Sequence, residues 1–406
     1  MREKKVCVIG LGYIGLPTAA LLASRGYLVS GYDINNDVVN TINQGNIHIV
    51  EKDLDYFVEQ AVKNGQLKAF PEPQQSDIYI ICVPTPFHQS TEIPSPNIDY
   101  VIEAAKKISK LLKKGDMVII ESTCPVGTTE KIFEIILDHG FDHNEIYIAY
   151  CPERVLPGNI MEELVTNNRI IGGVTDKSTK RISLFYEDFV KGEVLQTDHK
   201  TAEMCKLAEN SFRDVNIAFA NELSLICDKE GIDVWSLIKL ANRHPRVDIL
   251  QPGVGVGGHC IAVDPWFIAS RDHENSRIIR CAREINLYKT EWAQQKIQVL
   301  VDNFINENRK RPRIACLGVS FKPNIDDLRE SPALELVNKL SSLDLELFIV
   351  EPNINRHAKF KIHELELALD QADIIVVLVK HEEFLGTKII EKIKQKPFLD
   401  FCGIIS

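Results

Sequence analysis

A glycine-rich turn between a short apolar run and a helix-length stretch constrains the fold of this chain more than any other feature. Residues 6–9 are apolar and lead directly into Gly10-Leu-Gly12-Tyr-Ile-Gly15, the GxGxxG pattern. Gly10 permits a tight turn, Gly12 lets the backbone approach a pyrophosphate, and Gly15 lets helix and strand pack closely. Free N–H groups at the start of that helix favour a phosphate. The pattern predicts a dinucleotide site, with a ligand-free glycine turn as the alternative. The intervening residues assigned to the site are Tyr13 and Ile14.

Asp33 ends a second apolar run, 18 residues after Gly15. A carboxylate there accepts hydrogen bonds from a ribose 2′-OH and repels a 2′-phosphate, so the expected cofactor is NAD and not NADP. Two further loops, at 83–86 and 121–127, follow apolar runs where the carboxyl ends of strands meet ligands. We expect them to reach the cofactor, although both also fit turns stiffened by proline. The cofactor residues expected in these loops are Pro84, Thr85 and Thr123.

The first 200 residues alternate between strand and helix patterns, which predicts a parallel, doubly wound α/β sheet. Helical periodicity then replaces the strands over about 201–242 and 278–306, with a polar linker at 309–313 before the βαβ pattern resumes. We therefore expect two Rossmann-like lobes joined by a central helical domain. The domain ranges are 1–198, 199–308 and 309–406. The expected strands are 5–9, 28–33, 78–83, 117–121, 147–150, 169–172, 314–318, 345–350, 374–379 and 398–401.

Charge and composition narrow the classes of partner. The 406 residues carry 47 Lys+Arg against 57 Asp+Glu, a formal charge of −10, which argues against a nucleic-acid binder and an anionic membrane surface. No run reaches the roughly 18 apolar residues of a membrane span. Ten cysteines without a CxxC pair fit a reducing compartment, so we expect a cytoplasmic protein. No His, Cys or carboxylate spacing suggests a metal, and His259 is expected to be a loop residue.

Five side chains are candidates for chemistry. Cys260 follows a glycine-rich loop at 253–258 and becomes a nucleophile where a neighbouring cation or base favours its thiolate. Lys206 and Asn210 are one helical turn apart and face the same way. Glu153 follows a strand at the ligand edge and is a candidate base for water, and Asp264 comes soon after Cys260. Ordinary interpretations are also open: a lone cysteine is usually buried and inert, a lysine on a helix is usually solvated, and a glutamate after a strand is usually a cap.

Taken together, these motifs resemble the nucleotide-sugar 6-dehydrogenases, the family that includes UDP-glucose dehydrogenase. The glycine fingerprint, Val-Pro-Thr-Pro, Ser-Thr-x-Pro-Val-Gly, the Lys and Asn pair, the glycine loop before Cys260 and Phe-Lys-Pro occur in that order. The segment 151–158, Cys-Pro-Glu-Arg-Val-Leu-Pro-Gly, is similar to the acetamido-sugar branch, and the segments 201–216, 241–247 and 257–267 are similar to the UDP-N-acetylmannosamine branch. Pro157 stands where the glucose branch has a second glutamate, so Glu153 is expected to carry more of the water chemistry. UDP-N-acetylglucosamine and UDP-glucose remain alternative substrates.

The resemblance implies a four-electron oxidation of the sugar C6 alcohol to a carboxylate, using two NAD and one water. Lys206 and Asn210 would stabilise the alkoxide-like oxygen. Cys260 would form a thiohemiacetal and then a thioester, which water hydrolyses with help from Glu153. Asp264 would orient the lysine or the water, and Thr123 would place water nearby.

The resemblance also implies sites for the UDP-sugar and the phosphates of NAD. Arg329 is similar to an arginine near the NAD phosphates, and Lys322 to a lysine on the UDP side. A homodimer through the central helices is expected, with Arg243 or Arg246 reaching a neighbouring site. The remaining substrate-binding residues are Arg154, Val155, Gly255, Gly257 and Phe321.

Two other classes fit parts of the sequence. A non-catalytic NAD- or UDP-sugar-binding protein would use Cys260 as a redox sensor, but the full set of five candidate side chains argues against it. An ordinary hydroxyacid dehydrogenase would make one NADH per substrate and would need no thiol.

Overall fold

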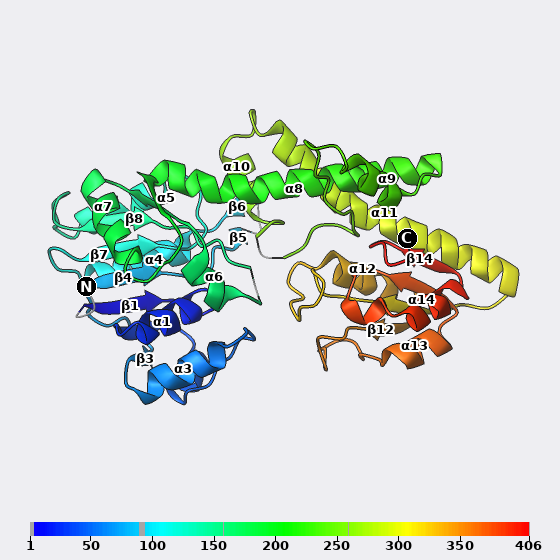
Figure 1. The fold of residues 1–406 in the computed structure, drawn as a ribbon, viewed down its shortest axis with the longest axis horizontal. Helices are drawn as coiled ribbons and strands as arrows, with labels where there is room; N and C mark the ends of the chain where they lie inside the picture. The colour runs from blue at the N-terminus through cyan, green and yellow to red at the C-terminus, as the bar shows by residue number, and fades with distance from the viewer. Residues whose placement is uncertain (1–3, 89–93, 157, 259, 406) are drawn as a thin grey trace. The chain divides into compact units, whose positions relative to one another are not determined.

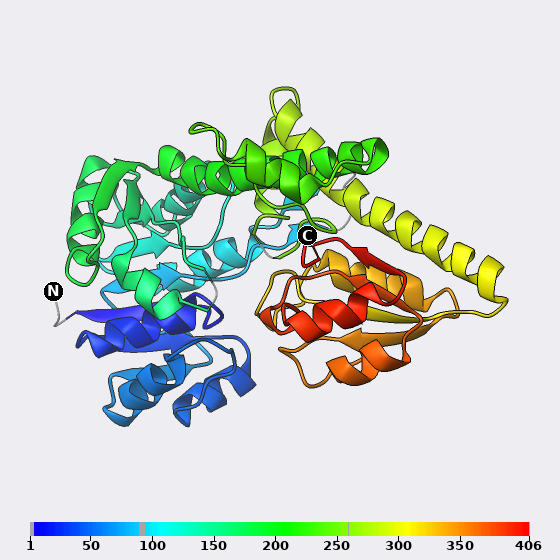
Figure 2. The same ribbon diagram turned by 45° about the vertical axis from the view of Figure 1, so that its right-hand side comes forward.

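The computed structural model describes residues 4–88, 94–156, 158–258 and 260–405. The chain divides into two compact units (Figures 1 and 2). The N-terminal unit comprises Met1–Ala208 with Trp266–Arg271, and the C-terminal unit comprises Glu209–Pro265 with Asp272–Ser406. Each unit is described by itself.

An eight-stranded sheet forms the centre of the N-terminal unit, in the order β10-β9-β8-β7-β4-β1-β2-β3 (Figure 1). The strands are β1 (Lys5–Ile9), β2 (Leu28–Tyr32), β3 (Leu67–Phe70), β4 (Ile78–Ile81), β7 (Met117–Ile120), β8 (Tyr147–Tyr150), β9 (Arg169–Gly173) and β10 (Val194–Asp198). A small hairpin pairs β5 (Phe87–His88) with β6 (Ser95–Pro96). Sequence patterns predicted six of these strands, some of them one or two residues too long, and missed β3, β10 and the hairpin.

Helices cover both faces of this sheet, as the alternation of its buried residues requires. In β1, Val6 and Val8 pack into one core and Cys7 and Ile9 into the other. The first core also holds α1 (Gly15–Ser24), α2 (Asn36–Asn43), α3 (Leu54–Lys63), α6 (Ile160–Thr166) and α7 (Asp176–Tyr186), and the second holds α4 (Asp99–Ser109) and α5 (Thr128–Leu137). The expected doubly wound α/β architecture is confirmed.

One strand pair corrects the expectation of a parallel sheet. β9 runs antiparallel to β8, with Ala149 opposite Gly173 and Tyr150 opposite Gly172, whereas every other pair in this sheet is parallel in the described part. The connection between them contains only the seven-residue α6. A parallel return needs a crossover that carries the chain back along the full length of the strands before the next strand begins. Because the chain does not make it, β9 starts at the edge where β8 ends.

Long helices and a second sheet make up the C-terminal unit. The helices of its central part are α8 (His199–Glu230, whose first ten residues belong to the N-terminal unit), α9 (Val234–Ala241) and α11 (Arg277–Asn308). The four-stranded parallel sheet, shown in Figure 2, has the order β12-β11-β13-β14. The remaining elements are β11 (Arg313–Leu317), α12 (Pro332–Ser341), β12 (Glu346–Val350), α13 (Leu365–Gln371), β13 (Ile374–Val377), the short 3₁₀ helix η1 (Glu382–Phe384), α14 (Thr387–Lys394) and β14 (Phe398–Asp400).

The expected central helices and C-terminal parallel sheet are therefore present. The expected polar linker is shorter than its charge pattern suggested, because Arg309 caps α11 and Arg313 already belongs to β11. α10 (Asp264–Arg271) begins in the C-terminal unit and ends in the N-terminal unit. Among the helices of the described ranges, none combines the length and apolarity needed to cross a membrane.

Candidate active site

The glycine turn after β1 has the geometry that the fingerprint requires. Gly10 has φ +87°, and a Cβ there would lie 2.7 Å from the Cys82 carbonyl oxygen. A Cβ on Gly15 would overlap the Gly10 carbonyl. A Cβ on Gly12 would meet no atom within 4 Å. The protein's own packing does not exclude a side chain at Gly12, so the space beside it is available to a pyrophosphate.

Asp33 lies directly after β2 and is fixed beside this turn. Its Oδ2 accepts the Leu11 N–H at 3.0 Å and its Oδ1 accepts the Asn35 N–H at 2.9 Å. His48, which the sequence gave no reason to select, lies close enough to interact electrostatically with Asp33. Burial lowers the pKa of His48, and Asp33 opposes that shift. Tyr13 packs on the core beside the turn, and Ile14 precedes the first residue of α1. This arrangement fits a dinucleotide whose ribose reaches Asp33.

The loops after β4 and β7 are tied together at the same edge of the sheet. The Ser122 hydroxyl donates to the Val83 carbonyl oxygen at 2.7 Å. Thr85, after Pro84, is buried and Thr123 is half-buried.

The buried Glu203 of α8 holds the start of α5, next to the loop of Thr123. Its carboxylate accepts the N–H groups of Gly127 and Thr129 at 2.6 and 2.7 Å. A carboxylate therefore occupies the N-terminus of α5, which is not left open for a phosphate.

Glu153 lies three residues after β8 and is 6% exposed. Its Oε2 accepts a hydrogen bond from Arg169 Nη1 at 2.8 Å, its Oε1 accepts the Arg154 N–H at 2.5 Å, and its carbonyl oxygen accepts Lys206 Nζ at 2.7 Å. The structure thus brings together two residues expected to be catalytic, Glu153 and Lys206, through the backbone of one and the ammonium of the other. Val155 packs against the core of this unit.

A second buried carboxylate, Glu121, lies in the same cluster at the end of β7. Its Oε1 accepts the Tyr186 hydroxyl at 2.6 Å, and its Oε2 is 3.4 Å from the Cys82 sulfur. Burial raises the pKa of Glu121, although the charge of Arg169 opposes the shift. Burial acts to lower the pKa of Arg169, but the surrounding acidic groups, Glu153 first among them, together outweigh it and hold that pKa above its usual value. Glu121 and Arg169 were not selected from the sequence, because nothing local links them to Glu153.

In the C-terminal unit, the loop before Cys260 packs on a second loop after β11. A Cβ on Gly257 would contact the Glu330 carbonyl oxygen, and one on Gly258 would lie 2.7 Å from the Phe321 ring. The Gly258 N–H donates to the Arg329 carbonyl oxygen at 3.2 Å. These close contacts explain why glycine is needed there, and they join the segment of Cys260 to that of Phe321.

Two more of the expected catalytic residues meet in this unit. Asn210 Nδ2 donates to Asp264 Oδ2 at 2.5 Å, and both side chains are buried. The Asp264 N–H donates to the Cys260 carbonyl oxygen at 2.8 Å, and the Cys260 side chain is exposed. Gly255 has φ +147°, and a Cβ there would lie 2.6 Å from the Thr290 hydroxyl oxygen.

The expected cations of the C-terminal unit lie on loops. Lys322 is exposed, and the Ser320 hydroxyl donates to its carbonyl oxygen at 2.8 Å. Arg329 donates from Nε and Nη2 to the Asp327 carboxylate, the Nη2 bond at 2.6 Å. Arg243 and Arg246 are exposed after α9. Pro157 and His259 lie outside the described residues.

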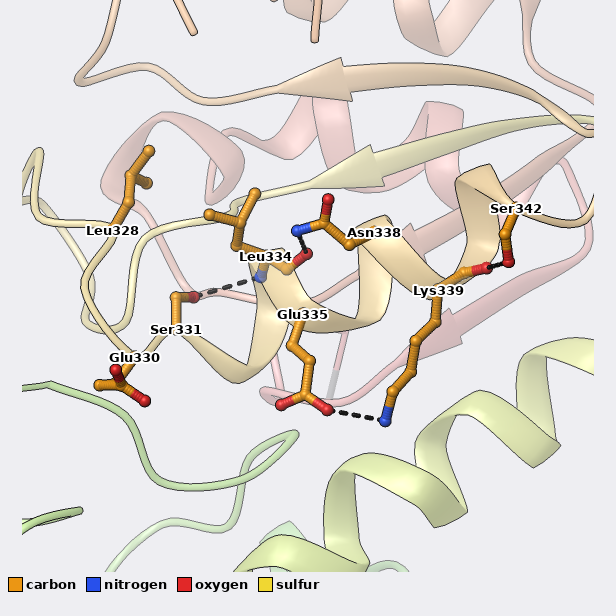
Figure 3. Close-up of a pocket in the computed structure, with 8 residues that line it drawn as sticks. All are labelled: Leu328, Glu330, Ser331, Leu334, Glu335, Asn338, Lys339 and Ser342. Atoms are coloured by element: carbon orange, nitrogen blue, oxygen red, sulfur yellow. Dashed lines mark hydrogen bonds and ion pairs between the residues drawn. The ribbon is translucent and has the colours of Figure 1, made fainter. Parts of the chain in front are cut away.

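An open pocket of about 550 Å³ lies along α12 in the C-terminal unit (Figure 3). Figure 3 shows that its cation, Lys339, is paired with Glu335 on the same helix. None of the expected site residues lines it. Among the residues that the structure describes, no three His, Cys, Asp or Glu side chains form a group that could hold a metal ion.

Comparison with protein families matches three consecutive parts of the chain. Residues 4–190 match the NAD-binding domain of the UDP-glucose/GDP-mannose dehydrogenase family, residues 200–288 its central domain and residues 315–406 its UDP-binding domain. The chain belongs to this family. The resemblance inferred from the motifs is confirmed, and with it NAD as the cofactor, whose site the residues around Gly12 and Asp33 fit.

Individual relatives are similar over nearly the whole length. A UDP-N-acetyl-D-mannosamine dehydrogenase of Campylobacter jejuni is 52% identical, over 98% of this chain and 99% of its own. An NDP-N-acetyl-D-galactosaminuronic acid dehydrogenase of Ralstonia nicotianae is also 52% identical, over 94% and 92%. The solved UDP-D-ManNAc dehydrogenase of Pyrococcus horikoshii is 39% identical with a TM-score of 0.89, covering 99% of this chain and 96% of its own.

Proposed function

We propose that this chain oxidises the C6 alcohol of UDP-N-acetyl-D-mannosamine to the carboxylate, giving UDP-N-acetyl-D-mannosaminuronate. The observation that carries the proposal is the full-length similarity, at about half of all positions, to dehydrogenases named for that substrate. Each substrate would consume two NAD and one water. Bound NAD supplies the hydride acceptor, and the protein's residues supply binding, charge stabilisation and the nucleophile.

In the first oxidation, Lys206 and Asn210 would stabilise the negative charge that develops on the C6 oxygen. Both lie on α8, four residues apart. Lys206 is held by the Glu153 carbonyl oxygen and Asn210 by Asp264. These contacts restrict each polar group before substrate binds, so less side-chain freedom is lost on binding.

In the second oxidation, the Cys260 sulfur would add to the C6 aldehyde as a thiohemiacetal, and loss of a second hydride would leave a thioester. Hydrolysis would break the C–S bond and form a C–O bond to water. Glu153 would accept a proton from that water, and Thr123 would help to place it. Asp264 would act through Asn210, which it contacts, rather than through the lysine.

The UDP end of the substrate would bind between the two loops that pack on each other in the C-terminal unit. Gly255, Gly257 and Phe321 would contact it, and Lys322 would approach a phosphate. Arg154 and Val155 would reach the sugar, and Arg329 would leave Asp327 for the NAD phosphates. The geometry that favours this assignment is the exposed position of Lys322 next to Phe321, whose ring lies against Gly258 of the glycine-rich loop.

A homodimer forms part of the proposal. Phe212, Phe219 and Ile226 are spaced by seven residues on α8, and each is more than half exposed. A second copy that covers this stripe would remove it from water. Arg243 or Arg246 would then reach the neighbouring copy's site. Light scattering on Phe212→Glu/Phe219→Glu tests this, because the double variant would be monomeric where the parent is a dimer.

The test of the reaction is NADH formed per mole of sugar consumed. Two NADH from UDP-N-acetylmannosamine, with little from UDP-N-acetylglucosamine or UDP-glucose, would support the proposal. The Ralstonia relative favours a second candidate, an N-acetylgalactosamine nucleotide, which belongs in the same series. Two NADH from another sugar would keep the chemistry and change the substrate, whereas one NADH from every sugar would contradict the thioester route.

A further inference from the structure

We propose that Arg169 is a positioning residue for the reaction: through a buried ion pair it holds the Glu153 carboxylate in the orientation from which it accepts a proton from the hydrolytic water. This inference rests on the proposed function and deepens it. Arg169 is the first residue of β9 and lies outside every motif that the sequence identified, 11 residues beyond the segment 151–158.

The antiparallel pairing of β8 and β9 places the two residues opposite each other. Tyr150 pairs with Gly172, and the same register, extended by three residues, sets Glu153 against Arg169. The side chains meet there, at 2.8 Å between Arg169 Nη1 and Glu153 Oε2. Had β9 run parallel to β8, Arg169 would have begun at the opposite edge of the sheet.

Both charged side chains are removed from water. The Arg169 side chain is 2% exposed and that of Glu153 is 6% exposed. A buried cation interacts strongly with a contacting anion, and removal of either partner leaves the other charge without compensation. The pair therefore fixes the position of the Glu153 carboxylate more firmly than a surface pair would.

The geometry leaves Glu153 able to accept a proton. Its two oxygens offer about four acceptor positions, of which the Arg169 guanidinium and the Arg154 N–H use two. A water can still donate to the carboxylate while Arg169 remains bound. Lys206 contacts the carbonyl oxygen of Glu153 and does not compete for the carboxylate.

Other groups fix Arg169 in turn. Its Nη2 donates to the Leu164 carbonyl oxygen at 3.3 Å, and its guanidinium lies over the Tyr186 ring, 5.7 Å from the centroid. The Tyr186 hydroxyl donates to Glu121, the second carboxylate in the cluster. Burial favours the protonated form of Glu121, although the charge of Arg169 opposes this shift, whereas the Glu153 carboxylate contacts the guanidinium directly. The cation's nearest anion is therefore Glu153.

Arg169 and Glu153 serve the hydrolysis of the thioester on Cys260. The water oxygen bonds to the thioester carbonyl carbon, and the C–S bond to Cys260 breaks. One water proton passes to Glu153 and from there restores the Cys260 thiol, while the other is released as the product carboxylic acid ionises. Loss of Arg169 would slow this step more than the hydride transfers, since those do not use the Glu153 carboxylate.

The experiment combines rapid quench with intact-protein mass measurement of the acyl group on Cys260. Glu153→Gln and Arg169→Met should each accumulate the adduct, with hydrolysis slowed roughly 100-fold or more, the contribution of a general base. Arg169→Lys should recover part of the rate. Arg169→Met/Glu153→Gln leaves neither charge buried without its partner, and it should be no slower than Glu153→Gln, because Arg169 acts through Glu153.

Arg283→Met is the matched control, since Arg283 forms the other buried arginine–carboxylate pair of the described residues, with Asp214. It should lower thermal stability without accumulating the adduct. Equal accumulation in this control, fast hydrolysis in Arg169→Met, or a further slowing in the double variant would overturn the inference. If the parent enzyme forms no NADH with any UDP-sugar, the proposed function fails instead.

Discussion

Four buried residues between α8 and α11 predict an unusual response to a nearly isosteric substitution. Arg283 Nη1 and Asn286 Nδ2 both donate to Asp214 Oδ1, at 2.7 and 2.8 Å. Asn221 Nδ2 donates to Asn286 Oδ1 at 2.8 Å, and the Gly253 N–H donates to Asn221 Oδ1 at 2.9 Å. Since a backbone N–H can only donate and a carboxylate can only accept, the two ends fix the orientation of both amides.

Asn221→Asp breaks this chain of hydrogen bonds, because an ionised carboxylate cannot donate to the Asn286 oxygen. Flipping the Asn286 amide would restore that bond but would point its oxygen at Asp214. The introduced carboxyl must stay charged and uncompensated or take up a proton. Protonation from an ordinary pKa of about 3.9 costs about 1.4 kcal/mol per pH unit, which limits the penalty to about 2 kcal/mol at pH 5.5. At pH 8 that limit exceeds about 5 kcal/mol, and we expect a loss of roughly 3–5 kcal/mol.

The direction of the pH dependence follows from the linkage between proton binding and folding. The folded-state pKa of the introduced carboxyl is raised above its unfolded value, so relative stability falls as the pH rises above the unfolded value. Calorimetry at pH 5.5 and pH 8 measures the Tm of Asn221→Asp relative to the parent. At roughly 2–4 °C per kcal/mol, the expected loss lowers the Tm by about 6 °C or more at pH 8. Asn216→Asp, the same change at a less buried site on α8, is the control and should cost no more than about 0.5 kcal/mol at either pH. The reasoning would be refuted if both variants lost the same stability, or if the loss in Asn221→Asp did not increase between pH 5.5 and pH 8.

Three other outcomes are expected. Asp33→Ser should raise the KM for NAD and reduce the preference over NADP at least tenfold, and initial rates with an unchanged ratio would contradict the ribose role. Iodoacetamide should label the exposed Cys260 and Cys281 first, and NAD with UDP-sugar should protect only Cys260 of the two in peptide mapping. Burial lowers the pKa of Lys289 from 10.5 to about 7, so its contribution to stability rises with pH between those values. The gain in Tm from Lys289→Met should therefore be largest at pH 7 and below and shrink toward pH 10. The change in Tm from Lys296→Met, at a more exposed lysine, should not follow this pH dependence.

The N-terminal dinucleotide site could be predicted because its signals are contiguous. A strand, three glycines and a helix form within one local segment, and the hydrophobic patterns of β1 and α1 define both ends. The alternation of strand and helix likewise predicted the α/β class. Strand ends were less accurate, since apolar residues such as Val83 continue past the last ladder hydrogen bond.

The carboxylate cluster could not be predicted in this way. The residues of β9 carry no signal that the strand runs antiparallel, and only that direction sets Arg169 opposite Glu153. Glu121 was expected only as the last residue of the strand 117–121, but the sheet and α7 bury it beside Tyr186. Its raised pKa is a consequence of burial, and burial depends on the whole fold.

The sequence by itself therefore determined the fold class, the cofactor turn and the residue types available for chemistry, because each is encoded over a few neighbouring positions. The tertiary structure decided which of these side chains contact one another and which of them are buried. Glu153 with Arg169, Asn210 with Asp264 and the glycine loop with Phe321 are all contacts between segments that are distant or differently directed in the chain. The physical reason is that charge state and orientation depend on burial and on strand direction, and neither is a property of a local segment.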